Sequence, residues 1–165
     1  LLCLTPFVQD RLGKLTTELN IQGGGRMTMW FEITPALIRE HPWGIGYRSL
    51  TNEMMRDIAP YVEADRDHLH SNIAQVLVAT GGLGFVLYML WMLAALHAGW
   101  TYFRAARDAV DPPDAISALA VLCMLVGLLL NGVVEYNLGD GELVLAYGLL
   151  MGTCIAGQQR YRKTV

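Results

Sequence analysis

The sequence predicts an all-α, polytopic integral membrane protein with a large helical loop on one side of the membrane. Hydrophobic residues make up 53% of the 165 residues, and the mean hydropathy is +0.34, which is high for a water-soluble domain. Most charged residues lie between residues 10 and 70, and long stretches beyond this region carry almost none. Uncharged apolar stretches of about 20 residues are typical of helices that cross a bilayer. The charge-poor stretches therefore predict transmembrane helices, and the charged region predicts the loop.

Three charge-poor stretches predict membrane spans. The first two, residues 73–96 and 115–134, reach the length of about 20 apolar residues that a spanning helix needs. The third, residues 143–157, is shorter and glycine-rich, so it requires a locally thinned bilayer or flanking residues that reach the interface. The expected division of the chain is the end of a transmembrane helix (1–9), a large loop (10–71), a helix (72–96), a loop (97–114), a helix (115–134), a short loop (135–142), a helix (143–158) and a tail (159–165).

The two ends of the predicted spans differ in charge. Segment 97–114 and the tail carry arginine or lysine, whereas segment 135–142 carries neither. Short loops rich in these residues stay in the cytoplasm, while long loops cross largely regardless of charge. We therefore expect segment 97–114 and the tail to be cytoplasmic, and the large loop and segment 135–142 to be periplasmic. The apolar, methionine-free start further predicts the C-terminal part of a larger polytopic protein.

Composition argues against some other classes of protein. The net charge of −3 and the absence of a basic stripe with interleaved aromatic residues do not suggest a nucleic-acid partner. Cys3, Cys123 and Cys154 lie in apolar segments without the spacing of a metal site, so we interpret them as filler among apolar side chains.

His70 stands where the charged region ends and the first predicted span begins. A histidine at the boundary between water and membrane can accept or donate a proton near neutral pH, which suggests chemistry at the bilayer surface. Gly81 and Gly84 follow inside the span, where small residues allow neighbouring helices to approach closely. The alternative is that His70 is a polar residue at the start of a helix with no chemical task.

Several local signals predict structure in the large loop. Three glycines at 23–25 predict a tight turn, because glycine adopts positive φ at low cost. Residues 27–33 predict an interfacial helix, with Trp30 at headgroup level. Thr34 and Pro35 match an N-cap followed by proline at the first helical position. The remaining expected elements are a helix through Glu40, a turn over 41–47 and a short helix over 49–59.

Four polar residues carry the other site hypotheses. The planar guanidinium of Arg26 suits phosphate or diphosphate oxygens, and anionic lipid headgroups are its alternative ligand. Glu135 and Asn137 lie close to the second span, where the ordinary roles are helix capping and solvation, and intramembrane polar residues mark functional sites. His68 precedes His70 in the pattern Asp65-x-Asp67-His68-x-His70, which could hold a metal, but the two histidines would still need a third ligand. We expect no metal, and we expect the His68 ring to point away from the His70 ring on a helical backbone.

The order of four motifs resembles the bacterial O-antigen ligase and O-antigen polymerase superfamily. His70-Ser71, nine residues and Gly81-x-x-Gly84 resemble its His-[Asn/Ser/Gln]-x9-Gly-x-x-Gly signature. Gly25-Arg26 with Trp30 is similar to its Gly-Arg-x-x-x-Trp motif, segment 41–46 to its His-Pro-x-x-Gly-x-Gly turn, and segment 135–140 to a stretch near its C-terminus. Tyr47-Arg48 departs from the small or proline residue that commonly follows the turn, so the role of Arg48 is open.

The resemblance implies a GT-C-like glycosyltransferase in the bacterial inner membrane, active on the periplasmic face. It would move a glycan from an undecaprenyl-diphosphate carrier to an acceptor hydroxyl, which for a ligase is on lipid A–core and for a polymerase is on another repeat unit. The implied catalytic residues are His70 and Arg26; the implied substrate-binding residues are Arg48, Glu135 and Asn137. No cofactor is expected, and the fragment alone would be inactive. A transporter or flippase fragment is the alternative from another class, although transporters tend to place polar groups at mid-membrane.

Overall fold

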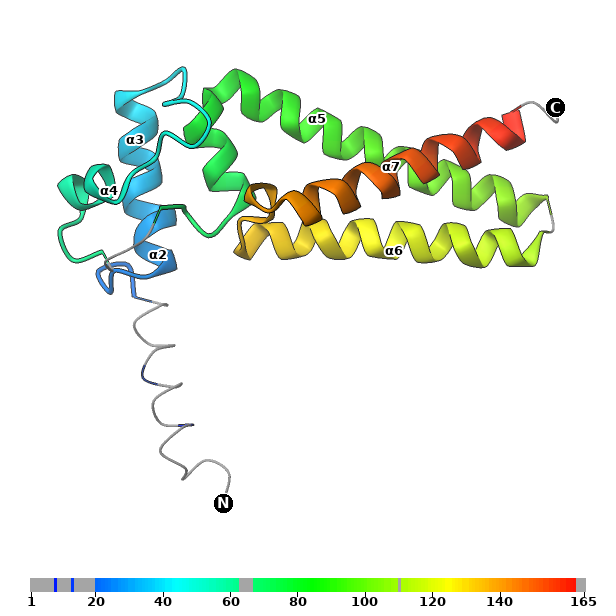
Figure 1. Cartoon of the computed structure of the whole chain (residues 1–165), viewed down its shortest axis with the longest axis horizontal. Coiled ribbons are helices and arrows are strands. Elements are labelled where there is room, and N and C mark those ends of the chain that lie inside the picture. Colours follow the sequence, from blue (N-terminus) through cyan, green and yellow to red (C-terminus); the bar gives the residue numbers. More distant parts are fainter. Residues whose placement is uncertain (1–7, 9–12, 14–19, 63–66, 110, 163–165) are drawn as a thin grey trace. The chain divides into compact units, whose positions relative to one another are not determined.

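The computed structural model describes residues 8, 13, 20–62, 67–109 and 111–162. Every regular element in this part of the chain is a helix (Figure 1), as the sequence predicted. In chain order these are α2 (Arg26–Thr28), the π-helix η2 (Met29–Ile33), α3 (Thr34–Glu40), α4 (Asn52–Ile58), α5 (Asn72–Asp108), α6 (Pro112–Val134), the 3₁₀-helix η3 (Asn137–Gly139) and α7 (Gly141–Arg162). The expected helix end at residues 1–9 lies, apart from residue 8, outside the described residues.

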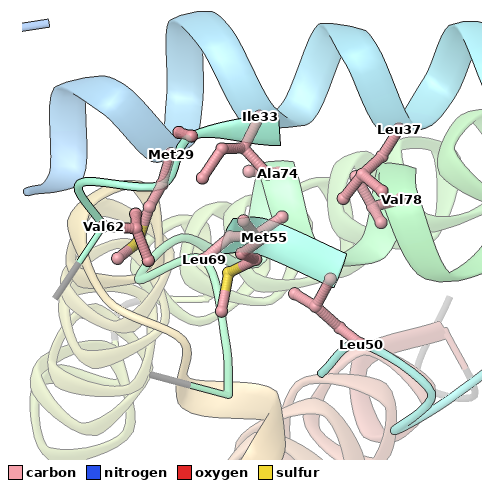
Figure 2. Packing of buried hydrophobic residues seen from close by; sticks show 10 residues of the cluster. Met29, Ile33, Leu37, Leu50, Met55, Val62, Leu69, Ala74 and Val78 are labelled. Carbon is pink, nitrogen blue, oxygen red and sulfur yellow. The ribbon is translucent and has the colours of Figure 1, made fainter. Parts of the chain in front are cut away.

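The chain forms two compact units, Leu1–Phe85 and Val86–Val165. The first unit has a buried apolar core, to which η2, α3, α4, the segment before α5 and the first turns of α5 contribute (Figure 2). Met29, Ile33 and Leu37 recur every four residues and so share one helix face. Burying each such side chain contributes roughly 1.5–3 kcal/mol. The labelled members of this core are Met29, Ile33, Leu37, Leu50, Met55, Val62, Leu69, Ala74 and Val78.

The predicted glycine turn is present at the start of α2. Gly24 has φ of +79°, and a Cβ at this position would lie 2.2 Å from the carbonyl oxygen of Tyr61. The Gly24 N–H donates to Thr28 Oγ1 at 2.9 Å, and the Thr28 hydroxyl donates to the carbonyl of Ile21. Thr28 is fully buried, so these bonds fix the turn against α2 from inside the unit.

The predicted N-cap at Thr34 is wrong. Ile33 before it is already helical, and the Thr34 hydroxyl donates to the carbonyl of Met29 at 2.7 Å. Through η2 the backbone N–H of Thr34 also bonds the Met29 carbonyl, five residues back. Pro35 has no N–H and its ring crowds the preceding turn of an α-helix. The wider π-helical turn accommodates the proline, so one helical segment runs from Arg26 to Glu40 without a new start.

α5 has a break at Gly81, whose φ of 67° and ψ of −173° are not helical. The break interrupts the helical hydrogen bonding of the preceding turn, where Val78 and Ala79 are buried. Their carbonyls accept hydrogen bonds from the N–H groups of Ile45 at 3.0 Å and Gly46 at 2.9 Å. Because buried carbonyls need partners, segment 41–46 completes the hydrogen bonding of α5 at its kink.

The kink and segment 41–46 approach each other too closely for side chains. A Cβ on Gly81 would lie 2.5 Å from the carbonyl oxygen of Pro42, and one on Gly44 would lie 2.5 Å from that of Ala79. We expected Gly81 to permit close approach of another helix. What approaches it is the backbone of a loop, because Gly81 leaves the helical conformation and presents its own backbone there.

The second unit contains the rest of α5 together with α6, η3 and α7. At one end of this unit, the hydroxyls of Tyr102 and Tyr161 donate to the Asp114 carboxylate at 2.8 and 2.6 Å. The hydrogen bond to Asp114 raises the pKa of Tyr161 to about 12, so the Tyr161 hydroxyl stays protonated and acts as a donor. Near the other end, the Tyr147 hydroxyl donates to the carbonyl of Leu128 at 2.9 Å. These bonds link α7 to α6 at two levels.

Two of the described helices, α5 and α6, are long and apolar enough to cross a membrane. They contain the first two predicted spans. The third predicted span forms most of α7, which does not meet the same test of length and composition among the described helices. Its crossing of the membrane therefore stays a prediction.

Candidate functional site around His70

His70 lies directly before the N-terminus of α5. Ser71 begins the helix: its Oγ accepts from the N–H of Ala74 at 3.4 Å, and its carbonyl accepts from that of Gln75 at 2.9 Å. His70 itself is half-buried and has φ of +47°, in the left-handed region. Such values are uncommon for residues other than glycine, and they concentrate at functional sites. The backbone geometry thus adds support to the residue that the sequence singled out.

The backbone of Leu69, the residue before His70, is hydrogen-bonded at both its N–H and its carbonyl. The N–H of Leu69 donates to Gln75 Oε1 at 3.0 Å, and the Leu69 carbonyl accepts from Trp30 Nε1 at 2.8 Å. The Leu69 side chain is fully buried in the core. Residues from α5 and η2 therefore fix the backbone from which the His70 imidazole projects.

The sequence analysis did not predict the two hydrogen bonds that fix the backbone of Leu69. The expectation of Trp30 at headgroup level stays a prediction, whereas its indole N–H bonds a backbone carbonyl within the unit. Gln75 was not singled out, although it is a polar residue in an apolar helix and only 4% exposed. A polar residue such as glutamine in an apolar helix needs a hydrogen-bond partner when it is buried. This requirement could have marked Gln75 as a residue that bonds a neighbouring segment.

The expected direction of the His68 ring is wrong. The rings of His68 and His70 lie side by side, with centroids 4.2 Å apart and planes at 55°. The reason is that the backbone from Asp67 to His70 is not helical, so the expected helical spacing does not apply. His68 Nδ1 also bonds Asp67 Oδ1 at 2.7 Å, which lowers the pKa of the Asp67 carboxyl.

The contact between the two rings brings together two imidazoles, which are two of the ligands that the alternative of a metal site requires. A structural zinc ion takes four ligands and a catalytic one three protein ligands. Asp67, the nearest carboxylate in sequence, points its Oδ1 at His68. Asp65, which belongs to the same predicted pattern, lies outside the described residues. The expectation of a metal-free site stays a prediction.

Arg26 is the first residue of α2 and is half-buried. It follows two buried glycines, Gly24 and Gly25, and the carbonyl of Gly25 accepts from the N–H of Met29 at 3.2 Å. Arg26 precedes Trp30 by four residues, so both side chains leave neighbouring positions on the same side of the helical segment. Trp30 bonds the residue before His70. That Arg26 forms a common site with His70 stays a prediction.

The other predicted site residues have different settings. Arg48 is exposed, has φ of 58°, and its guanidinium lies 5.5 Å from the Tyr47 ring centroid. Glu135 and Asn137 belong to the second unit. Glu135 is half-buried at the end of α6 and accepts from the N–H of Tyr136 at 3.3 Å. Substrate binding by all three stays a prediction.

Asn137 is the most enclosed of these residues, at 1% exposed. Its Oδ1 accepts from Asn131 Nδ2 at 3.1 Å, and its Nδ2 donates to the carbonyl of Leu128 at 3.3 Å. That carbonyl also accepts from Tyr147. The Asn137 amide therefore joins η3 to the last turns of α6, which fixes the position of the short segment between α6 and α7.

Taken together, these features define a chain whose described regular elements are all helices, with two helices apolar enough to cross a membrane and a histidine fixed at the start of one of them. Comparison with known families identifies it further: residues 1–89 match the O-antigen ligase family, and the chain belongs to this family. The protein is thus a membrane enzyme of the O-antigen ligase and polymerase type. The matched range includes the motifs at Arg26, segment 41–46, His70 and Gly81. A search of curated proteins gave no match.

Proposed function

We propose that the protein is a membrane glycosyltransferase that moves a glycan from an undecaprenyl-diphosphate carrier to an acceptor hydroxyl on the periplasmic face of the inner membrane. As an O-antigen ligase, it uses lipid A–core as the acceptor. Membership of the O-antigen ligase family supports this reaction class. No nucleotide sugar takes part, since the carrier diphosphate is the leaving group.

His70 acts as the general base in this proposal. The acceptor oxygen attacks the anomeric carbon, its proton passes to an unprotonated ring nitrogen of His70, and the bond from that carbon to the diphosphate oxygen breaks. The leaving carrier diphosphate gains negative charge. Arg26 stabilises this charge through its fixed guanidinium, as preorganised cations do in other group transfers.

The fixed backbone at Leu69 and His70 is the observation that carries the proposal. Hydrogen bonds from Trp30 and to Gln75 hold the Leu69 peptide, and His70 has φ of +47°. A residue that merely began a helix would not need this conformation. A general base does need a defined direction, because proton transfer depends on hydrogen-bond geometry to the reacting hydroxyl.

Two alternatives remain to be separated by experiment. A polymerase of the same family would use the same donor and another repeat unit as acceptor. A transporter or flippase fragment is less compatible with the chain, because the family is one of ligases and because His70 stands at the start of the apolar helix α5 and not at its middle.

The test is complementation of a deletion strain with the full-length gene or its His70→Ala variant. For a ligase, we expect His70→Ala to abolish glycan attachment to lipid A–core, while carrier-linked polymer keeps its normal chain length and the membrane level of the protein is unchanged. Shortened chains would identify a polymerase. Near-normal attachment with His70→Ala would refute the general-base role, and the variant His97→Ala, at an exposed position of α5 outside the family motifs, controls for the loss of a histidine.

A further inference from the structure

The exposure of α5 changes abruptly at its kink. Before Gly81, Ala74, Val78 and Ala79 are buried in the core of the first unit and cannot contact lipid. After it, large apolar side chains become exposed, with Leu83 at 66%, Val86 at 52%, Leu87 at 58%, Leu90 at 56% and Leu93 at 61%. An exposed apolar helix face of this length in a helix fit to cross a membrane is the surface that lipid tails cover.

Segment 41–49 limits how deep the first turns of α5 can lie. Its backbone pairs with Val78 and Ala79, yet most of the segment is irregular and exposed, including the charged Arg48. Exposed irregular backbone does not occur within the hydrocarbon region, because lipid offers no hydrogen-bond partners. The turn of α5 beside this segment is therefore outside the hydrocarbon.

The same segment carries side chains suited to the headgroup layer. Trp43 is 83% exposed and Tyr47 is 63% exposed, and the Arg48 guanidinium lies over the Tyr47 ring. Tryptophan and tyrosine concentrate at membrane interfaces, and arginine there pairs with lipid phosphates. The close contact of Gly44 with the kink keeps the segment at the level of Gly81.

We propose that the hydrocarbon region begins at the Gly81 kink and that segment 43–48 rests on the lipid headgroups beside it. The first turns of α5 then belong to the water-facing unit, and the span starts about eight residues later than the sequence suggested. Counting about 20 residues from Gly82 brings the end of the span to Thr101. Trp100 precedes this point and Arg104 follows it, as is typical of a cytoplasmic boundary.

Thiol accessibility in membranes tests the position of the boundary independently of activity. In the full-length protein with its native cysteines replaced, single cysteines are placed at the exposed positions Ile73, Thr80, Leu87 and Leu90. A membrane-impermeant maleimide should label Thr80→Cys within about threefold of the rate for Ile73→Cys, and the other two at least about tenfold more slowly, because thiolates do not form in hydrocarbon. Labelling in denaturant, equal for all four, controls for expression.

Two results would overturn the proposal. Labelling of Thr80→Cys as slow as that of Leu87→Cys would return the boundary to residue 73. Labelling of Leu87→Cys and Leu90→Cys as fast as that of Ile73→Cys would show that lipid does not cover this face of α5.

A nitroxide at position 43 tests the headgroup contact. On Trp43→Cys in vesicles, we expect more collisions with oxygen and fewer with a water-soluble nickel chelate than on Arg39→Cys, an exposed position of α3. Equal nickel accessibility at the two positions would place Trp43 in water and remove it from the membrane surface. That result would fit an aromatic platform for carbohydrate instead.

Discussion

At the scale of single residues, His70 occupies a conformation that its own side chain does not favour. A left-handed backbone at a residue other than glycine costs of order 1–3 kcal/mol. The two hydrogen bonds of the Leu69 peptide each return about 0.5–1.5 kcal/mol, and burial of the Leu69 side chain adds to them. The neighbours of His70 thus suffice to hold this conformation, whose consequence is a fixed direction for the imidazole.

The role of Arg26 can be tested by a change that keeps its charge. In Arg26→Lys, an ammonium replaces the planar fork that can donate two parallel hydrogen bonds to a diphosphate. We expect transfer to fall by roughly tenfold or more, since a charged hydrogen bond contributes about 1.5–3 kcal/mol. Initial rates on a purified lipid-linked donor measure this effect. Arg39→Lys on α3 is the control, and equal rates for lysine and arginine at position 26 would indicate nonspecific headgroup attraction.

Trp30 should act on the reaction through His70 without touching substrate. Trp30→Phe keeps a ring in the core but removes the N–H that donates to the Leu69 carbonyl. We expect kcat to fall about five- to tenfold, equivalent to one hydrogen bond of about 1–1.5 kcal/mol, with KM for the donor nearly unchanged. Trp91→Phe, at an exposed position of α5, is the matched control. A rise in KM with constant kcat would indicate instead that Trp30 binds substrate.

At the scale of elements, the sequence predicted most helices but not the contacts that place them. The short helix α4, the glycine turn and the helix ending at Glu40 follow from local signals and are confirmed. The pairing of segment 41–46 with the kink at Gly81 could not be predicted, because it joins two glycine motifs through backbone groups that carry no sequence signal. Likewise, a Thr-Pro pair is compatible both with the start of a helix and with a position directly after a π-helical turn. For Thr34-Pro35 the burial of Met29 and Ile33 in the core decides for the second arrangement.

Neighbouring glycines in α5 offer a matched pair for testing the kink. Gly81→Ala introduces a Cβ 2.5 Å from the Pro42 carbonyl oxygen at a residue with φ of +67°. The left-handed backbone alone costs roughly 1–2 kcal/mol, and the clash adds to it. At Gly82 a Cβ meets nothing within 4 Å, so Gly82→Ala should be neutral or stabilising by up to about 1 kcal/mol.

Thermal unfolding of the two purified variants in detergent measures this difference. We expect a clearly lowered midpoint for Gly81→Ala and an unchanged or raised one for Gly82→Ala. Equal midpoints would mean that segment 41–46 does not depend on the kink for its position.

At the scale of the whole molecule, composition alone does not determine how many helices cross the membrane. α6 is apolar enough to span, whereas α7 is not among the described helices that meet this test. The second unit nevertheless ties them together at two levels, through Tyr147 to Leu128 and through Tyr161 to Asp114. Fourteen residues separate the two bonds on each helix, so α7 follows α6 in the opposite direction over about 21 Å. We therefore expect α7 to cross the membrane wherever α6 crosses it.

Reporter fusions to the full-length protein test this topology. We expect fusions after Asp67 and after Asp140 to report the periplasm, and fusions after Asp108 and after Arg162 to report the cytoplasm. The physical reasons are the arginines of segment 97–114 and of the tail, and the attachment of α7 to α6. The Asp108 fusion serves as the internal control, since α5 passes the length and composition test by itself. Periplasmic signal after Arg162 would show that α7 turns back without crossing, and opposite signals after Asp67 and Asp140 would refute the common periplasmic face.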